Sequence, residues 1–144
     1  MIQPRTVVTW VMPILLGLAA IACTAQPLVR RSETITPARD PAVVEAAILK
    51  ALANRGWVAQ RERPGSLLAT LDLRTHQVVT RITYSGCGFE VDYVSSKDMG
   101  YTKDASGQER IHRNYNGWVA NVVRDTEAYL EGRQPDGGLL EQQK

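Results

Sequence analysis

Several residue types on which function often depends are scarce in this sequence of 144 residues. It has two cysteines, two histidines and a formal net charge of +2. So small a basic excess argues against nucleic acid binding, because nucleic-acid-binding domains usually carry a strong one. No cluster of Cys, His, Asp and Glu with ligand spacing surrounds either histidine, which argues against a zinc site. We therefore expect no nucleic acid partner, no metal and no cofactor.

Charge is also missing from one long stretch, Thr6–Ala22, which follows Arg5. Secretory signal peptides have a positive start and an apolar segment of roughly 7–15 residues, whereas a spanning helix needs about 20. Pro13 and Gly17 interrupt the apolar run and weaken a continuous helix. Residues 1–22 are therefore predicted to be a signal peptide for export from a bacterial cytoplasm.

The four residues Ala20–Cys23 resemble the lipobox of bacterial lipoproteins, although leucine is usual where Ala20 stands. The resemblance implies that Cys23 is lipidated, first with a diacylglycerol and then on its freed amine. Two or more chains anchor a protein stably, because each buried CH₂ contributes about 0.8 kcal/mol. Thr24, in place of Asp, resembles the enterobacterial pattern for the outer membrane, facing the periplasm, rather than the inner membrane. Two alternatives stay open: cleavage by ordinary signal peptidase to a soluble protein, or an uncleaved anchor.

The chain after the signal peptide has 122 residues, enough for one modest domain. Residues 23–39 are polar, proline-containing and aperiodic, which predicts a flexible linker. The domain is expected over 40–131, and a disordered tail over 132–144. Cys87 would be the lone free thiol. We expect it to be a small buried hydrophobe; pairing between chains, or reaction, is the alternative.

Two helical patterns flank the domain. Asp40 suits a helix cap and Pro41 the first helical position, and apolar residues at helical spacing continue until Gly56. A helix is therefore predicted over 41–54. A second is predicted from about Glu109 to Leu130. Its core face repeats at helical intervals: Ile111, Tyr115, Trp118, Val119, Val122, Thr126, Tyr129 and Leu130.

Between the helices, alternating apolar and polar residues predict four antiparallel strands. Three of them have inward sets, which are Leu67, Ala69, Leu71 and Leu73, then Val78, Thr80, Ile82 and Tyr84, then Phe89, Val91 and Tyr93. The predicted fold class is α+β: a four-stranded antiparallel meander with both helices on one face, in the order α-β-β-β-β-α. Residues 96–109 are predicted to be a polar loop, onto which Met99 and Tyr101 could fold back.

The turns predict the register of the meander. A two-residue turn at 75–76 places Leu73 opposite Val78, and a four-residue loop at 85–88 places Tyr84 opposite Phe89. The second register also sets Arg81 opposite Asp92. The first strand, Trp57–Glu62, is ambiguous. A turn of two or four residues at Pro64-Gly65 points Trp57 outward, and a bulge or an odd loop length would bury it.

The sequence offers only weak candidates for catalytic residues. His76 lies in a predicted turn, so we interpret it as a surface turn residue, and His112 lies at a predicted helix start, so we interpret it as a locally hydrogen-bonded residue. The segment Ser85–Gly88 would need a strand-turn-helix context and a base to act as a nucleophile elbow, but it joins two strands. Its glycines are explained by turn geometry. Alternating carboxylates are interpreted as a solvated sheet face: Asp72, Glu90 and Asp92. We predict no catalytic residue.

The most distinctive segment is IHRNYNGWV, at Ile111–Val119. Its aromatic residues could line a recognition groove, but helical spacing favours a place in the core. With Gly56-Trp57, Val91-Asp92-Tyr93 and Met99-Gly100-Tyr101, this segment resembles a family of small, uncharacterised proteobacterial lipoproteins. The resemblance covers most of the domain and supports lipidation of Cys23. It implies no activity.

The expected function is that of a membrane-tethered envelope lipoprotein, without enzymatic activity, that binds another envelope component. Its partners would be the membrane, through the N-terminal lipid anchor, and an envelope protein. The alternative is a periplasmic domain, secreted without lipid, that binds a small molecule or a lipid between its helices and its sheet. A cleft that gathers His112 with carboxylates would instead favour an enzyme.

Overall fold

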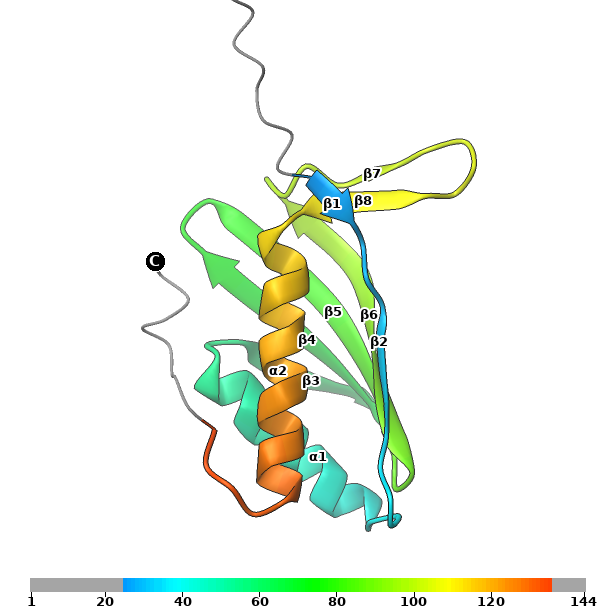
Figure 1. The fold of residues 1–144 in the computed structure, drawn as a ribbon. Helices are drawn as coiled ribbons and strands as arrows, with labels where there is room; N and C mark the ends of the chain where they lie inside the picture. The colour runs from blue at the N-terminus through cyan, green and yellow to red at the C-terminus, as the bar shows by residue number, and fades with distance from the viewer. Residues whose placement is uncertain (1–24, 136–144) are drawn as a thin grey trace, which may run out of the picture.

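The computed structural model describes residues 25–135 and has an α+β fold with two helices and two antiparallel sheets, as predicted (Figure 1). The predicted signal peptide (1–22), Cys23 and residues 136–144 of the predicted tail lie outside the described residues. Within 25–135, neither helix is long and apolar enough to cross a membrane.

Helix α1 spans Pro41–Asn54, with the bounds that the sequence predicts. The Asp40 carboxylate caps it by accepting a hydrogen bond from the Ala42 amide at 2.8 Å. The helix ends at Arg55, and the chain then turns through Gly56, whose φ of +75° favours glycine. Local capping chemistry therefore determines both ends of α1.

The larger sheet has five strands in the order β2-β6-β5-β4-β3. Their bounds are β2 Arg31–Thr34, β3 Val58–Arg63, β4 Ser66–Leu73, β5 His76–Ser85 and β6 Gly88–Lys97. The last four form the predicted meander, and their inward sets are buried or half-buried. The prediction of a four-stranded sheet is wrong by one strand, because β2 pairs with the outer edge of β6.

Strand β2 comes from the range in which the sequence predicts a flexible linker, so that prediction is wrong for its described part. Arg31 pairs with Val91 and Thr34 with Gly88. The Ile35 amide also donates to the Cys87 carbonyl at 2.8 Å. The sequence of β2 is polar, and hydrogen bonds to the edge of a distant strand make it a strand. The folded domain therefore includes the residues before Asp40.

One of the two predicted registers is confirmed. Tyr84 lies opposite Phe89 and Arg81 opposite Asp92. In the other hairpin Val78 lies opposite Leu71 rather than Leu73, because the turn is at Arg74-Thr75. Arg74 adopts a φ of 56° there. This shift of two residues keeps every side chain on the predicted face.

Trp57 is buried, at 4 % exposure, whereas the next residue, Val58, is 65 % exposed. The register of β3 against β4 shifts between Arg61 and Arg63. Such a bulge reverses the faces of the residues before it, which is the alternative that buries Trp57.

A smaller sheet covers one end of the domain, in the order β1-β8-β7. Its strands are β1 Ala25–Pro27, β7 Thr102–Lys103 and β8 Glu109–His112. Helix α2 spans Asn114–Leu130, so the prediction of a helix from Glu109 is wrong over its first turn. The predicted loop at 96–109 contains the end of β6 and all of β7, and Met99 within it is buried.

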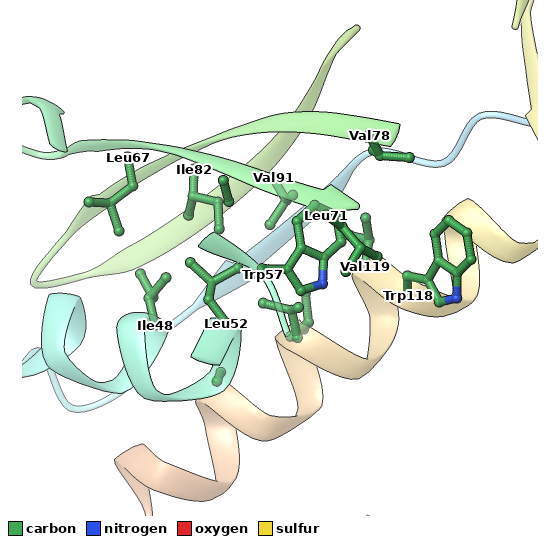
Figure 2. Close-up of a cluster of buried hydrophobic side chains, with 14 of the residues drawn as sticks. Ile48, Leu52, Trp57, Leu67, Leu71, Val78, Ile82, Val91, Trp118 and Val119 are labelled. Carbon is green, nitrogen blue, oxygen red and sulfur yellow. The ribbon is translucent and has the colours of Figure 1, made fainter. Parts of the chain in front are cut away.

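Both helices pack on the same face of the larger sheet (Figure 1). Figure 2 shows Ile48 and Leu52 of α1 and Val119 of α2 facing the strands, with Trp57 between the layers. Side chains from the inner face of the sheet complete this core: Leu67, Leu71, Val78, Ile82 and Val91. Because the core occupies the space between the helices and the sheet, we look for functional sites at the two ends of the domain and on the outer face of the sheet.

Candidate functional site

The predicted lipidation site, Cys23, lies two residues before the first described residue, Ala25. Strand β1 starts there and pairs with β8, so that Ala25 lies opposite His112 and Pro27 opposite Arg110. The Arg110 guanidinium also donates a hydrogen bond to the Ala25 carbonyl at 2.8 Å. The chain is therefore attached to the domain almost directly after the predicted lipid site.

Asn116 holds the next residues of this N-terminal segment. Its Oδ1 accepts a hydrogen bond from the Val29 amide at 3.0 Å, and its Nδ2 donates one to the Pro27 carbonyl at 2.8 Å. Between them, the Leu28 amide donates to the Glu109 carbonyl at 2.9 Å. One side-chain amide thus takes the place of a strand neighbour at the point where β1 ends.

Residues of the segment Ile111–Val119 have two roles: some pack in the core, and Asn116 binds the N-terminal segment. Ile111, Tyr115 and Trp118 are 0 %, 1 % and 8 % exposed, so their predicted place in the core is confirmed. Burial also raises the pKa of the Tyr115 hydroxyl. Asn116 points the other way and binds the N-terminal segment.

Polar and aromatic contacts close the corner between the two sheets. Glu109 accepts a hydrogen bond from the Tyr101 hydroxyl at 2.8 Å and from Arg30 at 3.2 Å. These bonds lower the pKa of Glu109, and the bond to Glu109 raises the pKa of Tyr101. The Tyr101 ring stacks on Tyr93 at 4.4 Å, and Tyr93 meets the edge of Tyr115 at 5.8 Å. The polar and aromatic side chains of this corner therefore all bind or stack on other residues of the domain.

The two histidines, distant in sequence, lie together at the same end. Their rings stack with centroids 6.0 Å apart, and a ring nitrogen of His76 is 2.7 Å from the Asp98 carbonyl oxygen. Burial, then His76 and Arg113, lower the pKa of His112. The described residues contain no group of three or more His, Cys, Asp or Glu able to hold a metal ion.

The opposite end carries the β5–β6 turn and Cys87. Cys87 is exposed, so the prediction that it is buried is wrong. Gly86 and Gly88 are needed for space rather than for φ. A Cβ on Gly86 would lie 2.2 Å from the Arg39 carbonyl oxygen, and one on Gly88 would lie 2.3 Å from that of Glu33. The glycines let the N-terminal segment cross the turn.

Two open hollows flank β2 at this end. One, of about 400 Å³, is rich in hydroxyl groups and also contains Cys87 and Glu90; its hydroxyl residues include Ser32, Thr34, Thr83 and Ser85. The other, of about 130 Å³, lies between the segment after β2 and the end of α2. Glu127 lines it, and burial, then Glu33 and Glu131, raise the Glu127 pKa. Both hollows are polar surface features.

The outer sheet face is solvated, as predicted, but its strongest pair differs from the predicted neighbours. Although Arg81 lies opposite Asp92, its guanidinium donates two hydrogen bonds of 2.8 Å to Glu62. Those bonds, followed by one from Ser66, lower the pKa of Glu62 to about 2. Of the other carboxylates, Asp72 lies in β4, and Glu90 and Asp92 lie two residues apart in β6.

The sequence analysis missed one buried ion pair. Arg55, after α1, donates to both carboxylate oxygens of Asp125 in α2, at 2.7 and 2.8 Å. The side chains are 1 % and 0 % exposed. Asp125 falls between Val122 and Thr126 on the buried face of α2, and a carboxylate in such a stripe is a signal of a buried partner. The pair joins the two helices.

Comparison of the chain with family models, curated proteins and solved structures found no match.

Proposed function

We propose that this chain is an exported envelope lipoprotein, tethered by lipid at Cys23, whose domain binds an envelope protein without catalysis. The supporting observation is the position of β1, the first strand that the structure describes. Cleavage between Ala22 and Cys23 would leave every described element intact, because β1 starts at Ala25. The resemblance of Ile111–Val119 to the small proteobacterial lipoproteins supports membership of that family.

Mass spectrometry of the mature N-terminus tests the tether. We expect the first residue to be Cys23 carrying diacylglycerol, and we expect Cys23→Ala to lose stable membrane association. Cys87→Ser is the matched control, because it removes the other cysteine and should leave membrane association unchanged. An unmodified N-terminus, or an unchanged membrane fraction for Cys23→Ala, would refute the tether.

The binding role is assigned to the end with the two hollows. Its exposed hydroxyl and carboxylate groups offer hydrogen bonds, as the rim of a protein interface does. A photo-crosslinker attached to Cys87 in intact cell envelopes should capture one protein reproducibly. The same reagent on Thr75→Cys in a Cys87→Ser background controls for proximity. Equal or no capture at the two positions would contradict the assignment.

The buried core argues against the alternative of a ligand pocket between helices and sheet. The buried residues between these layers, some of them labelled in Figure 2, are at most 8 % exposed, so little of their surface is open to a ligand. We therefore do not propose small-molecule binding there.

A further inference from the structure

We propose that the end of the domain carrying β1, β7 and β8 rests on the bilayer, where its exposed cations bind the phosphates of anionic lipids. This rests on the proposed lipid at Cys23. We call this end the basal end and define it by β1, the Arg74–His76 turn, Lys97–Gly100 and the β7–β8 hairpin. It is the upper end in Figure 1.

Covalent geometry places the lipid beside the basal end. Successive Cα atoms are 3.8 Å apart, so the Cα of Cys23 lies within about 7.6 Å of that of Ala25, whatever the conformation between them. A lipid on Cys23 has its acyl chains in the bilayer and its glycerol at the surface. Ala25 is therefore held within about one headgroup layer of the membrane.

The domain cannot swing freely about Ala25 while β1 remains paired. Strand pairing to β8, the Arg110 bond to the Ala25 carbonyl and the two bonds from Asn116 fix the segment to the domain. The same contacts place the β4–β5 turn near Ala25, because Ala25 lies opposite His112, whose ring stacks on that of His76. The Arg74-Thr75 turn is thus brought next to the attachment point.

The basal end carries exposed cations: Arg74, Lys97, Lys103 and Arg113. Lys103 lies 3.7 Å from Glu109, which also binds Arg30, so this carboxylate is paired within the domain. Arg74 and Lys97, in the β4–β5 turn and at the end of β6, are the cations that we assign to the lipid phosphates.

At the opposite end, burial and then the carboxylates of Glu33 and Glu131 raise the pKa of Glu127, whereas Arg133 lowers it. An anionic surface attracts cations only within about a Debye length, near 8 Å, so only the end nearest the lipid gains from it. The end with Glu33, Glu127 and Glu131 points toward the compartment.

The length of β5 makes the orientation measurable. It runs from His76 at the basal end to Ser85 at the other, and at about 3.3 Å per residue it spans roughly 30 Å. In the proposed orientation, Cys87, just beyond Ser85, therefore stands well outside the headgroup layer. Thr75, just before His76, lies at the headgroup layer.

The test uses the full-length lipoprotein in vesicles of phosphatidylcholine and phosphatidylglycerol, with headgroup-attached nitroxide lipids as quenchers. One sample carries a fluorophore on the native Cys87, and the other carries it on Thr75→Cys in a Cys87→Ser background. We expect quenching to be several-fold stronger at position 75 than at position 87. Charge reversal of Arg74 and Lys97 to Glu should lower it, whereas Arg39→Glu at the opposite end should not.

Mass spectrometry of the same samples separates the two proposals. A lipidated N-terminus with equal quenching at the two positions, or stronger quenching at position 87, would overturn the orientation alone. Unchanged quenching after charge reversal would overturn the role of the cations. An unlipidated N-terminus would overturn the tether and the orientation with it.

Discussion

Replacing Asp125 with alanine is expected to destabilise the domain more than any surface change. The buried Arg55 guanidinium would lose the carboxylate that accepts two of its hydrogen bonds, at 2.7 and 2.8 Å. Removing one partner of a buried ion pair costs about 3–5 kcal/mol, because the remaining charge stays away from water. For a domain of about 110 residues, each kcal/mol lowers Tm by about 4 °C, so we expect a fall of about 12–20 °C. Thermal and urea denaturation measure it.

Two variants isolate the cause. Arg124→Ala removes a cation whose Nε is 3.8 Å from the same carboxylate but whose side chain is 61 % exposed, so the loss should stay below about 1 kcal/mol. The double variant Arg55→Met with Asp125→Leu removes both buried charges and should recover most of the stability lost in Asp125→Ala. A loss under about 1 kcal/mol for Asp125→Ala would refute the reasoning, and so would a double variant no more stable than it.

Three further predictions concern the N-terminal segment, the turn that it crosses and the outer sheet face. Gly88→Ala should cost about 1–3 kcal/mol, because its Cβ would meet a backbone carbonyl oxygen at 2.3 Å. Gly117→Ala, in α2 with nothing within 4 Å, should instead gain about 0.5–1 kcal/mol; equal denaturation shifts would contradict the steric reason. Asn116→Ala should speed hydrogen exchange of the Val29 amide, with a global loss of about 1–2 kcal/mol, and unchanged exchange would show that Asn116 does not hold the segment. The carboxyl of Glu62 should titrate near its pKa of about 2 by NMR. Because that pKa is lowered on folding, the stability it contributes is present above the ordinary value of 4.5 and is lost as pH falls toward 2. Replacing Arg81 with Gln should return the titration toward 4.5.

Elements with local signals could be predicted from the sequence. Asp40, Pro41 and Gly56 determine the bounds of α1 through capping and turn chemistry, which act within a few residues. Alternation identified the inward face of the meander correctly. It could not choose the first register, because a shift of two residues leaves every side chain on the same face. The turn at Arg74, with its positive φ, decides that register.

Elements that depend on distant partners could not be predicted. Strands β1 and β2 are polar, and their hydrogen bonds go to β8 and β6, far along the chain. Helix α2 starts late because Glu109–His112 pairs with β1, a partner that the helical pattern does not reveal. The same holds at the candidate sites. The role of Asn116 depends on the path of the N-terminal segment, and the role of Asp125 depends on how the two helices pack.

The pairing of residues 25–39 with the domain also limits how far the domain can stand from a lipid at Cys23. While β1 and β2 are paired, residues 25–39 lie along the domain and add nothing to its reach from a lipid at Cys23. Peeled from β8 and β6, the same residues could extend by roughly 50 Å, at about 3.3–3.6 Å per residue. The structure shows the paired state of this segment. The distance between the lipid and the domain would therefore increase only if β1 and β2 separated from β8 and β6.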